Sequence, residues 1–117
     1  MKNIIHHSII VTSNDFNTLE LVRKEVEILF CRNMEAKNGQ QLISPIIPSL
    51  INRFCSFFIA PDGSKEGYDA SDDGDIIRRK TLDFLNSLAD MNGENNIRFV
   101  EVCYGSEDQK AVVLSNN

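Results

Sequence analysis

The chain has 117 residues, of which 42% are hydrophobic and 25% are charged, and its formal net charge is -5. This length predicts a single domain over residues 1–117, and the ordinary composition excludes a disordered chain. No apolar run approaches the roughly 20 residues that cross a bilayer, so we expect no membrane partner. The acidic balance argues against direct nucleic-acid binding, which depends on Lys and Arg contacts to phosphates.

The number and spacing of the cysteines indicate the redox compartment of the protein. Cys31, Cys55 and Cys103 are odd in number and form no CxxC motif. A disulfide framework would leave one of them over, and the two histidines are too few for a zinc site of familiar spacing. We therefore predict reduced thiols in a cytoplasmic protein, with no metal and no cofactor.

The first two elements are a strand and a helix. Residues 4–12 are rich in β-branched side chains and contain neither Gly nor Pro, which predicts a strand. Ser13 or Asn14 can cap the helix that follows. Apolar residues recur at helical spacing over 16–30, which predicts an amphipathic helix.

The middle of the chain predicts an edge strand followed by a central one. Pro45 and Pro48 interrupt the apolar run 42–48. Proline is confined to sheet edges because it donates no ladder hydrogen bond. Residues 54–60 are apolar at positions of both faces, which is typical of a central strand.

A second helix and two strands complete the pattern. Apolar spacing predicts a helix over 76–91, with Ser71 or Asp72 as its cap. Residues 97–104 alternate as a strand. Residues 110–114 can return beside that strand in a terminal hairpin.

The order of elements is therefore strand, helix, strand, strand, helix, strand, with one extra strand at the end. This is the order of the ferredoxin-like split βαβ fold, an α+β architecture in which two helices cover one face of an antiparallel sheet. We expect the first and third strands to lie side by side and to run parallel. Their carboxyl ends would then bring residues 12–15 and 60–75 to one edge of the sheet, where we predict the functional site.

An acidic segment lies at that predicted edge. Residues 61–75 contain six acids and one Lys, so this segment carries the formal charge of the whole chain. Its later acids can simply favour a helix N-terminus. A divalent cation is a second interpretation, which the spacing disfavours because the Glu that ends an EF-hand loop is missing. The third is a surface for a basic protein partner, made by Asp62, Lys65, Glu66, Tyr68, Asp69, Asp72, Asp73 and Asp75.

A small-ligand or nucleotide site at the same edge is the alternative. Helix N-termini favour anions, although the nearby acids oppose anion binding. The residues expected to contact such a ligand are Ser13, Lys65, Arg78 and Arg79. Arg78 and Arg79 can also serve only to neutralise the acidic segment.

Two adjacent histidines are a further candidate for chemistry. His6 and Ser8 form a His-x-Ser pattern similar to half of the two-histidine phosphoesterase motif, but the second half is missing from the sequence. Neighbouring strand residues point to opposite faces, so His6 and His7 do not readily serve one site, and we expect His7 to face the core. We predict no catalytic residues and a binding function rather than an enzyme.

Four stretches together resemble a family of small uncharacterised proteins encoded by bacteriophages and prophages. They are HHSIIVTS (6–13), SFFIAPDGSKEGYDASDDGD (56–75), RRKTLDFLNSL (78–88) and RFVEVCYG (98–105). The similarity covers most of the chain except 31–41, and APDGSKEG is its most specific part. The resemblance implies a phage accessory protein that binds and inhibits a protein in the host cytoplasm, such as a defence component. A homodimer through an edge strand or through the terminal hairpin is a further option that the sequence leaves open.

Overall fold

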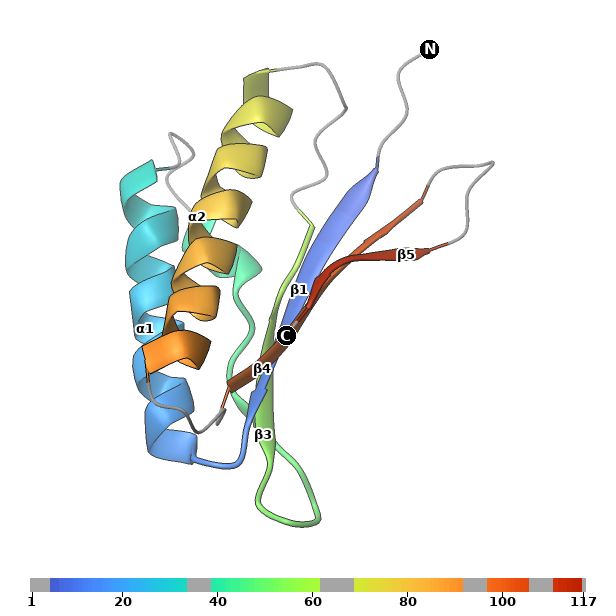
Figure 1. The fold of residues 1–117 in the computed structure, drawn as a ribbon. Helices are drawn as coiled ribbons and strands as arrows, with labels where there is room; N and C mark the ends of the chain where they lie inside the picture. Colours follow the sequence, from blue (N-terminus) through green and yellow to red (C-terminus); the bar gives the residue numbers. More distant parts are fainter. Residues whose placement is uncertain (1–4, 34–38, 62–68, 92–96, 106–110, 117) are drawn as a thin grey trace.

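Two α-helices, a short 3-10 helix and an antiparallel sheet make up the described part of the protein. The computed structural model describes residues 5–33, 39–61, 69–91, 97–105 and 111–116. Both helices lie on the same side of a five-stranded sheet, which confirms the predicted α+β class (Figure 1). The elements are β1 (His6–Ser13), α1 (Phe16–Asn33), the short 3-10 helix η1 (Gly39–Leu42), β2 (Ile47–Pro48), β3 (Cys55–Ile59), α2 (Asp69–Met91), β4 (Ile97–Tyr104) and β5 (Val112–Asn116). The strand order in the sheet is β2-β3-β1-β4-β5.

The strand β1 shows how the alternating pattern divides the sheet into two faces. Ile9 and Val11 are fully buried against the helices, whereas Ile10 between them is 43% exposed on the other face. His7 lies on the same face as Ile9 and is half-buried, as predicted. The core joins this face of the sheet to both helices. Its buried members include Leu19, Val22, Val26 and Phe30 of α1, Ile77 and Leu85 of α2, and Phe57, Ile59, Ile97 and Phe99 of the sheet.

The predicted parallel arrangement of the first and third strands is wrong. β1 pairs with β3 antiparallel, with Ile9 opposite Ile59 and Ser13 opposite Cys55. The reason is the position of the β2–β3 hairpin. β2 and β3 are antiparallel to each other, and β3 lies between β2 and β1, so it runs against both of its neighbours. The carboxyl ends of β1 and β3 therefore lie at opposite ends of the sheet.

The helix α1 begins at Phe16 and is capped by Asp15. Its Oδ1 accepts the backbone N–H of Asn17 at 3.1 Å and that of Thr18 at 3.4 Å. The sequence predicted Ser13 or Asn14 as the cap, and this prediction is wrong because Asp15 holds that position. The hydroxyl of Ser13 instead accepts the N–H of Asp15 at 3.1 Å and so fixes the turn between β1 and α1.

The helix α2 begins at Asp69, well before the predicted start at Ile76. Ser71 and Asp72 lie inside the helix, so the predicted cap is wrong. Gly74 suggested a loop in the sequence, but it is buried within the helix. Gly74 lines a small pocket together with Phe30 and Ile59, on the side of α2 that faces α1 and the sheet.

The sequence predicted which segments form the two edges of the sheet, but the bounds of both edge strands differ from the prediction. β2 is an edge strand of two residues, and an isolated bridge between Ile43 and Ile59 precedes it. The Nε of Arg23 donates to the carbonyl of Ser44 at 2.7 Å, which ties this segment to α1. β5 forms the other edge as the second strand of the predicted terminal hairpin, with a bulge opposite Glu101 and Val102.

Candidate functional site

The acidic segment is only partly within the described structure. Asp62, Lys65, Glu66 and Tyr68 lie outside the described residues. Asp69, Asp72 and Asp73 fall in the first turns of α2, where negative charge is favourable to the helix. Asp75 is exposed and forms an ion pair with Arg78 one turn later. The described part of the segment thus supports the helix-terminal interpretation for Asp69, Asp72 and Asp73 and a neutralising contact for Asp75 with Arg78.

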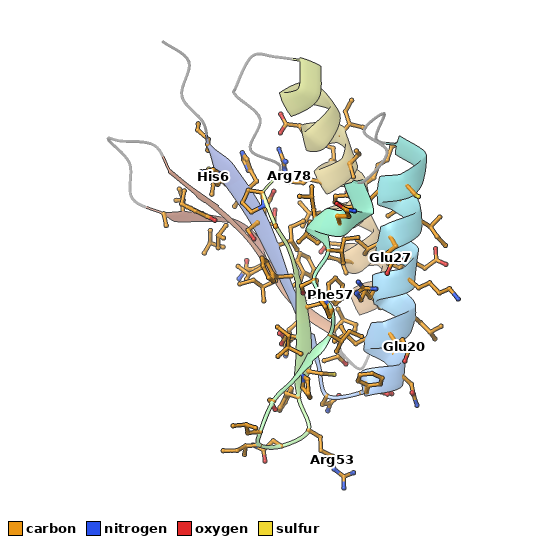
Figure 2. The ribbon with its side chains drawn as sticks, turned by 180° about the vertical axis from the view of Figure 1, so that it is seen from behind. His6, Glu20, Glu27, Arg53, Phe57 and Arg78 are labelled. Carbon is orange, nitrogen blue, oxygen red and sulfur yellow. The ribbon has the colours of Figure 1, made fainter. Side chains whose placement is uncertain are left out.

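The predicted small-ligand set is not brought together. Ser13 is buried at one end of β1, where it is opposite Cys55 and Ile97. Arg78 lines a pocket with His7, six residues back along the strand, so the two sites are about 20 Å apart at the usual strand rise. In Figure 2, Arg78 lies near the His6 end of the sheet and Arg53, two residues before Cys55, lies at the opposite end. Lys65 lies outside the described residues.

A polar pocket forms between α2 and the strands β1, β4 and β5. It has a volume of about 540 Å³. The sheet contributes one side chain each from β1, β4 and β5, and α2 contributes the opposite wall. Its lining consists of His7, Glu101 and Ser115 from the sheet and Asp75, Arg78, Arg79, Leu82, Asp83 and Asn86 from α2. We call this the α2 pocket.

Glu101 forms the floor of the α2 pocket. Its side chain is only 9% exposed. The Ser115 hydroxyl donates to Oε1 over a long 3.4 Å, and His7 Nδ1 lies 3.9 Å from Oε2, beyond hydrogen-bond reach. The bulge between β4 and β5 lies at this residue, and bulges commonly re-aim a side chain next to a site.

The spatial order of Ser115, Glu101 and His7 limits the chemistry that these three side chains can perform. A nucleophilic Ser-His-acid relay needs the imidazole between the hydroxyl and the carboxylate. Here the Glu101 carboxylate lies between Ser115 and His7. His6 and Ser8 offer no alternative, since the Ser8 hydroxyl donates to the Ile59 carbonyl at 2.8 Å and His6 packs on the ring of Tyr104. Among the described residues no group of three or more His, Cys, Asp or Glu side chains could hold a metal ion.

The second candidate surface is the face of the sheet that points away from the helices, which we call the open face. Phe58, Ile10 and Val100 lie directly opposite one another on three neighbouring strands. Ile47 of β2 and Val113 of β5 lie on the same face beside this row, where they pair with Ser56 and Val102. The most exposed members are Ile47 (58%), Val113 (56%), Ile10 (43%) and Phe58 (41%).

Two features give the open face a shape. A hollow of about 300 Å³ lies on it, lined by Ile10, Thr12, Arg98, Val100, Val113 and Asn116 among others. The β2–β3 hairpin protrudes from one end of the molecule (Figure 1). Its tip carries Leu50, which is fully exposed, and Ile51, which is 73% exposed. The turn then passes through Asn52 and Arg53, whose φ angles are 64° and 58°.

The sequence reasoning missed Glu101, Ser115 and the open face. A signal for Glu101 was present, because it shares a strand face with the buried Ile97 and Phe99, and a lone acid on an apolar face is uncommon. For the open face the signal was that residues 54–60 are apolar at positions of both strand faces, which indicates a strand that is covered on both faces. In the part of the chain that the structure describes, α1 and α2 cover only one of those faces (Figure 1).

Comparisons with known proteins assign no family. No protein-family model matches the chain, and no curated protein matches its sequence. The resemblance to phage-encoded proteins therefore stays a prediction. Within the described ranges, neither α1 nor α2 has the length and apolar character that a membrane-spanning helix needs.

Proposed function

We propose that this chain is a small, non-enzymatic binding protein that docks on another protein through the open face of its sheet. One observation carries the proposal: Phe58, Ile10 and Val100 form a continuous apolar row whose solvent side has no helix over it among the described residues. Contiguous apolar patches of this kind on a protein surface mark interaction sites more often than scattered exposed residues do.

The energetics of the face indicate what a partner must supply. Complete burial of one Ile or Phe side chain is worth about 1.5–3 kcal/mol, so covering side chains that are already half-buried gains about 1 kcal/mol each. Association itself costs about 4–15 kcal/mol. The partner therefore also has to insert an anchor side chain, and the hollow lined by Ile10 and Val113 is the receptacle we propose for it.

The acidic segment has a different role in this proposal. α2 lies on the helix side of the sheet, so Asp69, Asp72 and Asp73 are not on the open face. Charges outside the contact mainly change the rate of association. We propose that these acids steer the protein towards a basic surface that surrounds the partner's apolar patch. The resemblance to phage proteins puts that partner among the cytoplasmic proteins of a bacterial host.

The finer description of the fold belongs to the same proposal. We propose a ferredoxin-like split βαβ unit made of β1 to β4, with β5 added at one edge. The order β2-β3-β1-β4 and the two helices that connect β1 to β2 and β3 to β4 support it.

The test compares a variant of the open face with a variant of an exposed apolar residue on a different surface. Ile10→Thr/Phe58→Thr alters the open face and keeps good strand formers. Leu21→Ser removes an apolar side chain that is 68% exposed on α1 and serves as the control. Each protein carries a photocrosslinker at position 113, is irradiated in bacterial lysate, and the crosslinked species are identified by mass spectrometry.

We expect one host protein to crosslink to the wild type and the Leu21→Ser variant, and to be lost from the open-face variant. Neutralising Asp69, Asp72 and Asp73 together should slow its association and leave its dissociation rate unchanged. Crosslinks to a second copy of the chain would identify a homodimer and overturn the host-partner proposal. Equal crosslinking by all variants would refute docking through the open face.

A further inference from the structure

The α2 pocket contains a buried carboxylate with few partners. The side chain of Glu101 is nine-tenths buried, yet within the described part of the chain only Ser115 donates to it, over 3.4 Å. A buried carboxylate normally accepts several short hydrogen bonds, because removing it from water is costly. The long contact to Ser115 offsets little of this cost. Glu101 is therefore suited to a strong donor that enters from the pocket.

The opposite wall carries both signs of charge. Asp75 and Arg78 form an ion pair with each other. Arg79 is exposed on the same wall, and among the described side chains none forms an ion pair with it. With His7 counted as neutral, the lining holds the carboxylates of Asp75, Asp83 and Glu101 against two guanidiniums, so it has one uncompensated negative charge.

From this arrangement we infer that the α2 pocket binds a small amino-carboxylate of net charge +1, a molecule of the basic amino-acid type. A protonated amine of the ligand donates to Glu101, and its carboxylate lies against Arg79. Hydrogen bonds between charged partners are about twice as strong as neutral ones, so these two contacts set the ligand's orientation. A purely anionic ligand is disfavoured because it would be placed over the Glu101 carboxylate. The volume of about 540 Å³ is that of an ordinary metabolite site.

This site is independent of the open face, since it lies on the helix side of the sheet. The test is an amide NMR titration with three probes that separate the two recognised groups. L-Lysine carries two amines and a carboxylate, cadaverine carries the amines alone, and glutarate carries carboxylates alone. The variants are Glu101→Gln and Arg79→Gln. Their matched controls are Glu25→Gln on α1 and Arg98→Gln on the open face, both at exposed positions.

We expect L-lysine to shift the amide signals of Ile9 and Ser115, cadaverine to bind more weakly, and glutarate to leave them unmoved. Glu101→Gln should weaken L-lysine binding at least tenfold and Arg79→Gln severalfold, while both controls bind like the wild type. Arg79 is exposed on α2, so its variant keeps the test valid even if Glu101→Gln unfolds. The inference is overturned if L-lysine causes no shift in folded wild type up to about 10 mM, where even a millimolar ligand would be bound. Unchanged affinity in Arg79→Gln, or preference for glutarate, would overturn it equally.

Discussion

Two neighbouring phenylalanines in β3 test the assignment of the sheet faces. Phe57 is 1% exposed and lies between the sheet and the helices (Figure 2), whereas Phe58 is 41% exposed on the open face. Truncating a buried Phe to Ala costs about 3–5 kcal/mol. A chain of this size has about 6–18 kcal/mol of total stability, so Phe57→Ala removes a large share of it. Phe58→Ala loses strand propensity and partial burial, about 1 kcal/mol at most.

Urea unfolding followed by circular dichroism measures both variants. With an m-value of about 2 kcal/mol/M, Phe57→Ala should lower the unfolding midpoint by about 1.5–2.5 M and Phe58→Ala by less than about 0.5 M. The order would be reversed if the strand were shifted by one residue, because such a slip exchanges the two faces. Equal large losses would show that the open face is covered within the folded chain, which would refute the docking surface as well.

Three further predictions concern local features. Asp15→Ala removes the cap of α1 and should cost about 0.5–2 kcal/mol in thermal unfolding. Arg53→Gly relieves a positive φ at the hairpin tip and should stabilise the protein by up to about 1 kcal/mol, whereas no change would show that the turn is unstrained. Burial raises the pKa of the Cys55 thiol, to which the Asp15 charge adds, so iodoacetamide should label the exposed Cys31 first. Because the unfolded thiol ionises at lower pH than the folded one, this group's contribution to stability is full below the unfolded pKa and falls as pH rises towards the folded pKa.

Local patterns in the sequence were sufficient for much of the fold. Alternation over 97–104 predicts β4 with its observed bounds, and Pro48 places its segment at a sheet edge. The direction of β3 relative to β1 could not be predicted in this way. β1 and β3 pair through residues that are more than 40 positions apart in the sequence. Their relative direction depends on whether β3 lies between β2 and β1, which local patterns do not show. The start of α2 was missed because a glycine locally weakens a helix, whereas Gly74 is buried within α2.

The candidate surfaces were missed because each breaks a local rule. A sheet face is expected to be either apolar and covered or polar and exposed, and the open face carries an apolar row whose members Ile10 and Phe58 are exposed. A buried strand position is expected to be apolar, and Glu101 is charged. Such conflicts between local pattern and environment are expected at functional sites, where stability gives way to another requirement. The sequence contains a signal for the open face and for Glu101. Only the arrangement of the helices over the sheet shows that the first is exposed and the second is buried.

Glu101→Leu separates a functional origin of this buried charge from a structural one. Replacing buried charges with well-packed apolar residues is often neutral or stabilising by about 1–4 kcal/mol. If Glu101 is retained for a ligand, the variant should unfold at an equal or higher urea concentration and lose its response to L-lysine. If the hydrogen bond from Ser115 instead holds β4 and β5 together, the variant should be destabilised, because the Ser115 hydroxyl would lose its acceptor. Ser115→Ala is a second test of the two explanations, because it removes only the long 3.4 Å hydrogen bond. If Glu101 is retained for a ligand, this variant should change the urea midpoint little.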